Sequence, residues 1–270
     1  MQINKKAVII AGAVLVFFAV VSVVASKTVF KEKPPVPSPS PSAKPKISMP
    51  VNVKPVEERP YVTVSPTAAR EVVMTVHTMP KKASTADFEM TYSSAEKEEA
   101  AIGALDLSGG LPASKTILLG SKSGGGKITY HEKVSGGNLV LTFYDENYRL
   151  SNEWSYWTNT PKQTGFSSRD AKFQMVTGKL LDSAPYVIVY TSPGLPEGIE
   201  GTIVAGPYAV SIPGKLPSGE TELSVRLMEE AKATMYGWDG TAWVELKGIQ
   251  EGKQWTGKTE LYEMYVGVKK

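Results

Sequence analysis

Residues 118–133, LLGSKSGGGKITYHEK, hold the residue types that most suggest chemistry, because a glycine-rich loop ends on a lysine. A phosphate-binding loop has glycine, four further residues and then Gly-Lys-Ser/Thr, and it opens a helix whose amide groups face the phosphate. Here Lys127 is followed by Ile128, and Ser121 stands where the first glycine belongs. The next residues alternate between apolar and polar, which indicates a strand. We expect a flexible hairpin with no nucleotide, its arms at residues 116–119 and 127–132.

The other residues able to act in catalysis show no recognised spacing. The chain has no cysteine and two histidines, His77 and His131, which excludes disulfides, thiolate chemistry and a multi-histidine metal site. Both histidines fall on the polar faces of expected strands, so we interpret them as solvated. The carboxylate pairs 145–146 and 229–230 fall in turns, where calcium binding or acid–base catalysis is the alternative to simple solvation. We expect no catalytic residue, no cofactor and no metal.

Aromatic side chains give the main binding hypothesis. The apolar face of a pyranose ring stacks on exposed aromatic rings, so tryptophans on a strand can form a carbohydrate-binding surface. The alternative is that they fill the core, as Trp and Tyr commonly do. Trp157 and Trp243 are expected to be the most exposed, because their neighbours Tyr156 and Val244 point the other way. The candidate glycan-binding residues are Trp154, Tyr156, Trp157, Trp238 and Trp243.

The positive charge of the chain lies near its start. Residues 1–60 hold 9 Lys/Arg against 3 Asp/Glu, whereas residues 61–270 hold 21 against 24. Nucleic-acid binding requires clustered positive charge on the folded part, which this pattern does not provide. We therefore expect no nucleic-acid partner.

An apolar run follows residues 1–6. AVIIAGAVLVFFAVVSVVA, residues 7–25, is 19 residues without a charge. At ~1.5 Å per residue, such a helix comes close to spanning the ~30 Å hydrocarbon core of a bilayer. The run is longer than the apolar part of a usual signal peptide, which favours a retained signal-anchor helix over residues 7–26 in contact with lipid. Secretion after cleavage near Ala25 is the alternative.

A proline-rich stretch follows the apolar run. Residues 34–60 hold 9 prolines in 27 residues, which favours extended polyproline II over a packed core. We expect a disordered stalk over residues 27–60. Lysines on both sides of the apolar run leave its orientation open on charge alone, and a cytoplasmic domain on a tether is the alternative. This plan resembles bacterial single-pass surface proteins with Ser/Pro-rich stalks, a resemblance that implies extracytoplasmic domains.

Beyond residue 60 the pattern has a period of two. REVVMTVHT, ADFEMTY, NLVLTFY and TELSVRL alternate apolar with polar residues, and PYVIVYT is a continuous apolar run suited to a strand covered on both faces. Turn clusters such as SGGG and DEN separate these runs. We expect an all-β fold of two antiparallel β-sandwich units. Only SSAEKEEAAIGAL hints at a helix, with Ser93 and Glu96 at capping-box spacing, and it is short enough to be a loop turn instead.

The C-terminal residues form a second group of strands. Asp239-Gly240 is a preferred two-residue hairpin turn between the apolar arms of ATMYGWDGTAWVEL, and YEMYVGV reads as a terminal strand. This combination resembles the last strands of Ig-like or ZU5-like modules of cell-surface proteins. The expected domains are a β-sandwich over residues 61–194 and a small β domain over residues 195–270.

These features predict a membrane-anchored surface or envelope protein whose folded part has a non-catalytic display, adhesion or interaction role. Its expected partner is an envelope polymer, a glycan or another surface protein. A carbohydrate-binding module is the second hypothesis, and an enzyme with a site assembled from distant residues is the third.

Overall fold

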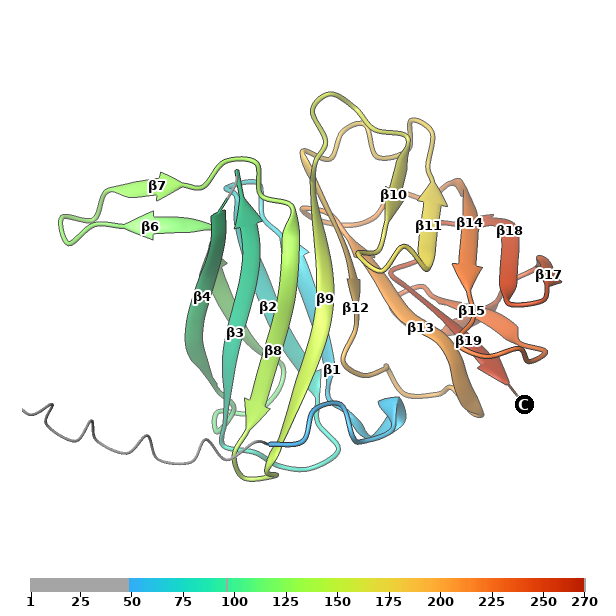
Figure 1. Cartoon of the computed structure of the whole chain (residues 1–270), viewed down its shortest axis with the longest axis horizontal. Helices are drawn as coiled ribbons and strands as arrows, with labels where there is room; N and C mark the ends of the chain where they lie inside the picture. The colour runs from blue at the N-terminus through green and yellow to red at the C-terminus, as the bar shows by residue number, and fades with distance from the viewer. Residues whose placement is uncertain (1–48, 96, 270) are drawn as a thin grey trace, which may run out of the picture. The chain divides into compact units, whose positions relative to one another are not determined.

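The described part of the chain is built from β-strands. The computed structural model describes residues 49–95 and 97–269, and these ranges hold nineteen strands and one 3-10 turn, η1 (Val56–Glu58). The strands that pair are antiparallel to one another (Figure 1). The all-β antiparallel class predicted from the sequence is confirmed. The predicted membrane helix, residues 7–26, lies outside the described residues, among which no helix is long and apolar enough to cross a bilayer.

A sheet of nine strands forms the centre of the fold. Its strands lie in the order β16-β15-β19-β13-β12-β9-β8-β3-β4. Their bounds are β3 (Thr85–Ser94), β4 (Lys97–Asp106), β8 (Gly136–Phe143), β9 (Tyr148–Thr158), β12 (Tyr186–Thr191), β13 (Thr202–Ser211), β15 (Thr234–Trp238), β16 (Trp243–Glu245) and β19 (Met264–Lys269). We call it the central sheet.

Two smaller sheets and one hairpin complete the fold. The three-stranded sheet has the order β1-β2-β5, with β1 (Tyr61–Pro66), β2 (Glu71–Thr78) and β5 (Ala113–Leu118). The five-stranded sheet has the order β10-β11-β14-β18-β17, with β10 (Gly165–Ser167), β11 (Phe173–Val176), β14 (Glu220–Arg226), β17 (Ile249–Glu251) and β18 (Gln254–Glu260). The hairpin consists of β6 (Gly120–Lys122) and β7 (Ile128–Tyr130), and it projects beside the end of β4 (Figure 1).

The two smaller sheets cover opposite faces of the central sheet. The three-stranded sheet and one central face share a hydrophobic core, and the five-stranded sheet shares a second core with the other face. Strand β12 shows the alternation: Ile188 and Tyr190 belong to the first core, whereas Val187 and Val189 belong to the second. Both faces of this strand are therefore buried, as its continuous apolar sequence predicted.

The period-two patterns correctly predicted which side chains are buried. Alternate residues of β2, β3 and β8 lie in the first core, and alternate residues of β14 lie in the second. The expected domain boundary at residues 194–195 falls in the connection between β12 and β13. These two strands pair with each other in the central sheet, and residues 49–270 form one compact unit.

The hinted helix in SSAEKEEAAIGAL is wrong. Strand β3 ends at Ser94, Ala95 takes a left-handed conformation with φ of 53°, and β4 begins at Lys97. The ten residues of β4 pair with β3 over its whole length, and Phe88 packs against Gly103. Pairing along all ten residues of β4 outweighs the capping box and the helix-forming residues behind it.

The expected stalk ends too late in the sequence, because residues 49–60 lie on the folded part. Val51 forms a parallel bridge with Arg149, and the side chain of Asn52 exchanges two hydrogen bonds with the backbone of Ser151. Lys54 Nζ lies 2.7 Å from the carboxylate of Glu146. These contacts replace the water that would otherwise solvate an extended proline-containing chain.

The turn between β15 and β16 is longer than its sequence suggested. Trp238 pairs directly with Trp243, so the loop has four residues, 239–242, instead of two. The carboxylate of Asp239 closes this loop by accepting hydrogen bonds from the backbone amides of Thr241 and Ala242 and from the Thr241 hydroxyl, all within 2.8 Å. An Asp turn of this kind competes effectively with a two-residue turn.

Candidate functional site

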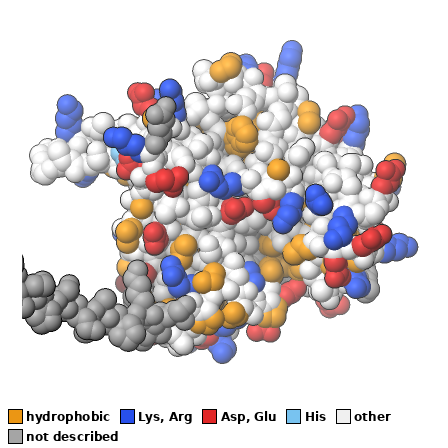
Figure 2. Space-filling view, in the orientation of Figure 1, with side chains coloured by type: hydrophobic (Ala, Val, Ile, Leu, Met, Phe, Trp, Pro, Cys, Tyr) orange, Lys and Arg blue, Asp and Glu red, His pale blue; other side chains and the backbone are white. Residues whose placement is uncertain are grey.

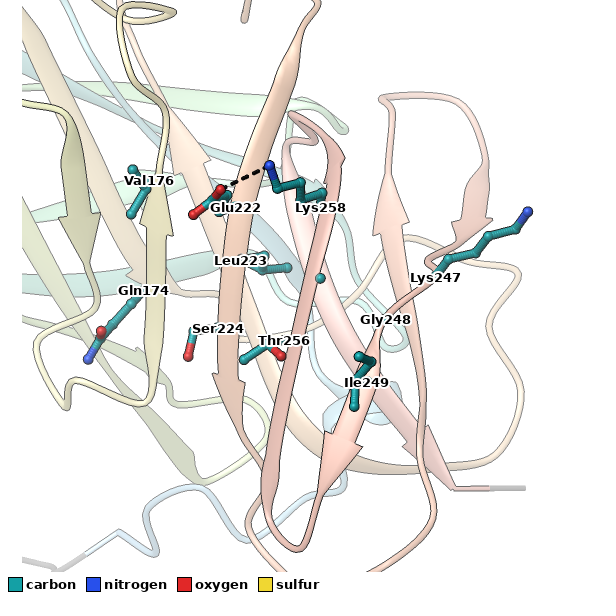
Figure 3. Close-up of a pocket in the computed structure, with 11 residues that line it drawn as sticks. Gln174, Val176, Glu222, Leu223, Ser224, Lys247, Gly248, Ile249, Thr256 and Lys258 are labelled. Carbon is teal, nitrogen blue, oxygen red and sulfur yellow. Dashed lines mark ion pairs between the residues drawn. The ribbon is translucent and has the colours of Figure 1, made fainter.

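An open groove of about 700 Å³ crosses the outer face of the five-stranded sheet. Figure 3 shows its lining side chains, which form two rows across the strands. One row is Gln174, Ser224, Thr256 and Ile249, and the other is Val176, Glu222 and Lys258. Val176 is 49% exposed and Ile249 is 67% exposed.

Several polar groups of this groove already have partners. Glu222 and Lys258 form an ion pair at 3.1 Å (Figure 3). The Ser224 hydroxyl accepts a hydrogen bond from Gln254. Positive and negative side chains are likewise interspersed over the face of the molecule in Figure 2. The groove therefore offers a ligand mainly apolar contact.

A smaller cleft of about 280 Å³ lies between the first strand hairpin and the central sheet. Strands β1 and β2 form one wall, β12 and β13 form the floor, and Trp238 with the loop after it forms the other wall. Its chemically active lining residues are Tyr61, Thr63, His77, Tyr190, Ser211, Trp238 and Glu263. We call it the Glu263 cleft.

A β-bulge places His77 in this cleft. The register of β1 and β2 shifts where Tyr61 faces Thr78 but Val62 faces Val76, so His77 is the extra residue. A bulge redirects the side chain of the strand that carries it. The His77 ring stacks on Tyr61 at a centroid distance of 4.9 Å, and its Nε2 lies 2.8 Å from the Thr63 hydroxyl.

Burial lowers the pKa of His77, so the ring is neutral at neutral pH. Burial also raises the pKa of Tyr61 and of Tyr190 well above the ordinary range of a phenol. Both hydroxyls therefore keep their protons. The cleft wall presents neutral aromatic groups and hydroxyls, and the one carboxylate among the lining residues is that of Glu263.

Glu263 is held at its backbone but not at its carboxylate. Its amide donates to the carbonyl of Trp238 at 2.9 Å, and its carbonyl accepts from the amide of Val210 at 2.9 Å. The half-buried carboxylate lies beside Gly240, where an added methyl group would be 3.3 Å from Oε1. Within residues 49–95 and 97–269, this carboxylate makes no hydrogen bond and no ion pair.

The surroundings of Glu263 are unfavourable to its charge. Burial is the main cause that raises its pKa, and the charge of Asp239 adds to it, whereas Lys215 acts in the opposite direction. Hydrogen bonds from Ala242 and Thr241 lower the pKa of Asp239, which therefore stays ionised. A ligand that donates hydrogen bonds to Glu263, or carries positive charge, would relieve this arrangement.

The structure separates the five predicted glycan-binding residues. Trp154 and Tyr156 are 1% and 5% exposed and belong to the first core. Trp157 takes the opposite face, as expected, but it packs edge-on against Phe166 and its indole nitrogen is buried without a partner. Trp154 and Tyr156 therefore present no open face to solvent, whereas Trp157 is only partly buried, as Trp238 and Trp243 are.

The two tryptophans of the β15–β16 hairpin lie together at the Glu263 cleft. Trp238 lines the cleft, and the ring of Trp243 is 5.3 Å from it between centroids. The Trp243 indole donates to the carbonyl of Glu197 at 3.2 Å. Both rings are partly exposed, so Trp238 provides the aromatic surface and Trp243 supports it.

Most of the remaining sequence candidates have partners. The glycine-rich loop is the tip of the β6–β7 hairpin, which confirms the predicted turn. The predicted first arm is wrong, because residues 116–118 belong to β5 and pair with β2, and β6 takes the place of that arm. His131 Nδ1 lies 3.1 Å from the Tyr92 hydroxyl. Asp145 accepts two hydrogen bonds from Ser84, Glu146 pairs with Lys54, and Glu229 pairs with Lys269. In the described residues no three His, Cys, Asp or Glu side chains gather to hold a metal ion.

Sequence reasoning missed Glu263, Tyr61 and Tyr190. Glu263 lies just before a terminal strand in LYEMYVGV, where its spacing matches no catalytic or binding motif. The two tyrosines occupy strand positions that are usually structural. Comparison of the chain with protein-family models, curated proteins and solved structures found no match.

Proposed function

We propose that this chain is a non-catalytic binding module of a membrane-anchored surface or envelope protein. The supporting sequence features are the apolar residues 7–25 and the proline-rich residues that follow. In this proposal the module faces outward, residues 7–26 contact lipid, and the two cores correspond to two Ig-like sandwiches that share the central sheet.

We propose further that the module binds saccharide units in the Glu263 cleft. The observation that carries this is an unpartnered, half-buried carboxylate in a cleft with a partly exposed indole. A saccharide presents an apolar ring face for Trp238 and hydroxyl donors for Glu263. A volume of about 280 Å³ admits one or two sugar rings and excludes a folded partner.

The binding experiment uses residues 49–270 and a panel of immobilised oligosaccharides. Trp238→Ala should weaken retention at least tenfold, a loss of about 1.4 kcal/mol or more in binding free energy. Its circular dichroism spectrum should match that of the natural chain, which shows that the fold is preserved. Glu263→Gln should weaken it less, because the amide still accepts one hydrogen bond. Ile249→Ala, in the groove of the five-stranded sheet, is the control. If Trp238→Ala leaves retention unchanged, the cleft is rejected as the binding site. Absence of retention on every oligosaccharide of the panel would reject it as well.

The localisation experiment is protease treatment of intact cells that express the full chain. A cut within the proline-rich residues 34–48 should release a fragment that contains residues 49–270, because the stalk would be accessible outside the membrane. Protection in intact cells, with release after lysis, would place the module in the cytoplasm. A freely soluble mature chain without residues 1–25 would instead show that the apolar run is a cleaved signal.

A further inference from the structure

A second hollow, of about 340 Å³, lies at the end of the fold opposite the His77 bulge on the β1–β2 hairpin. Its residues come from the β1–β2 turn, the β7–β8 connection and the ends of β9 and β12. The side chains with polar groups are Arg70, His131, Glu132, Lys133, Tyr156, Thr158, Thr160 and Tyr186. We call it the Arg70 pocket.

Two basic residues of this pocket have unusual backbone conformations. Arg70 and Lys133 have φ values of 59° and 53°, in the left-handed region that favours glycine. Such conformations cost on the order of 1 kcal/mol or more each, and they concentrate at functional sites. Neither residue is glycine or asparagine, the types that accept this conformation most easily. Both positions carry a long cation instead, which points to a role for the side chains.

The donors of the pocket are only partly used. Arg70 Nε donates to the Tyr186 hydroxyl at 3.1 Å, and its terminal nitrogens make no hydrogen bond or ion pair within the part of the chain that the structure describes. The same holds for the ammonium group of Lys133. The Tyr186 proton is then free to point to another acceptor. The charge of Glu132 opposes an anion, and with Arg70 and Lys133 it leaves one net positive charge.

The Tyr156 hydroxyl lies in the same pocket, buried and without a hydrogen-bond partner. Its ring centroid is 5.3 Å from that of Tyr186. A buried hydroxyl without a partner costs about 1–3 kcal/mol, so it is uncommon unless something fills the place. Burial raises the pKa of Tyr156, so the hydroxyl is a donor at neutral pH.

We propose that the Arg70 pocket binds an oxyanion, the carboxylate or phosphate group of a ligand. The Arg70 guanidinium offers paired N–H donors that match such a group, and the Tyr186 and Tyr156 hydroxyls lie beside it as further donors. Lys133 adds charge. This site is separate from the Glu263 cleft, so its presence does not depend on saccharide binding there.

The experiment titrates residues 49–270 with inorganic phosphate and, separately, with acetate, each followed by amide NMR shifts. We expect saturable shifts at residues 70, 133 and 186 with at least one ion, and weaker binding as sodium chloride is raised. If only phosphate produces saturable shifts, the pocket is a phosphate site. If only acetate produces them, the pocket is a carboxylate site. Saturation by neither ion would overturn the proposal.

Variants separate binding from folding. Arg70→Gly keeps the backbone conformation and removes the guanidinium, so it should weaken binding of the effective ion at least tenfold without loss of stability. Asn147→Gly relieves a similar backbone, with φ of 50°, outside the pocket, and should leave binding unchanged. Tyr156→Phe should also weaken binding. Undiminished binding in Arg70→Gly would contradict the assignment.

Discussion

At the scale of single residues, Glu263 carries a carboxylate that its surroundings, in the part of the chain that the structure describes, leave without a hydrogen-bond or ion-pair partner. Its half-buried carboxylate has no hydrogen-bond donor within residues 49–95 and 97–269, and it lies near an Asp239 whose own donors keep it ionised. Stable proteins usually pair such a charge or leave it fully in water. An unpaired charge in a cleft therefore favours a binding role over a structural one.

The first prediction follows from the raised pKa of Glu263. A raised carboxyl pKa means that the folded chain binds this proton more tightly than the unfolded chain does. The stabilisation of the fold by this protonated carboxyl is therefore complete below the unfolded pKa of ~4.3, and it is lost as the pH rises through the folded pKa. Glu263→Gln should therefore be more stable than the natural chain at pH 7, and the difference should shrink towards pH 4. Urea midpoints at pH 4, 5, 6 and 7 measure it.

The control for this prediction is Glu251→Gln, an exposed carboxylate on β17. It should leave the urea midpoint almost unchanged at each pH. A Glu263→Gln variant that is less stable at pH 7 than at pH 4, relative to the natural chain, would show that the carboxylate has a partner that stabilises its charge.

The sequence predicted only part of this site. The indoles of Trp238 and Trp243 were found because aromatic residues are rare enough to notice, but their pattern alone does not distinguish them from the buried Trp154. The Glu263 cleft is assembled from β1, β2, β12, β13 and β15, which are distant in sequence. The position of His77 depends on a bulge, and a one-residue register shift leaves no mark on a period-two pattern.

At the scale of elements, the start of β8 is the tightest place in the central sheet. Gly136 has a φ of 96°, and Gly137 passes directly against the carbonyl of Thr91 on β3, which also accepts the indole hydrogen of Trp154 at 3.1 Å. A side chain at either position would overlap neighbouring backbone. The two glycines therefore allow β8 to lie between β3 and β9.

The second prediction is that Gly137→Ala destabilises the fold by about 2–4 kcal/mol, because the backbone of β3 or β8 must move to admit the methyl group. Gly124→Ala is the matched control, since a methyl group at this hairpin tip meets nothing within 4 Å and should change stability little. Chemical denaturation of both variants measures the difference. Equal midpoints for the two variants would show that β8 and β3 have room to separate.

Strand types were easier to predict than strand partners. Alternation identified the buried residues of β2, β3, β8 and β14, since one face of each strand packs on a core. The helix hinted at after Ser93 does not form, because local propensity is weaker than pairing along ten residues of β4. The distribution of strands among three sheets depends on contacts far apart in sequence, which a local pattern does not contain.

At the scale of the whole module, the central sheet joins both sequence-predicted domains. Its strands β3, β4, β8, β9 and β12 precede residue 195, and β13, β15, β16 and β19 follow it. The two cores lie back to back on opposite faces of this sheet, so a side chain in one core is connected through β12, β13 and β19 to the other. This arrangement favours one cooperative unit over two independent domains.

The third prediction is that residues 49–270 unfold in a single transition, with equal calorimetric and van't Hoff enthalpies.

A fragment of residues 49–194 should not fold, because it ends after β12 and loses β13 as a partner. Val187 and Val189 would then face water on an unpaired edge strand, which promotes aggregation. Dispersed amide NMR signals from the fragment, or two heat-capacity peaks from the whole, would instead support two independent domains. In that case the Glu263 cleft would lie between separable units, because Tyr61 and His77 belong to the first and Trp238 and Glu263 to the second.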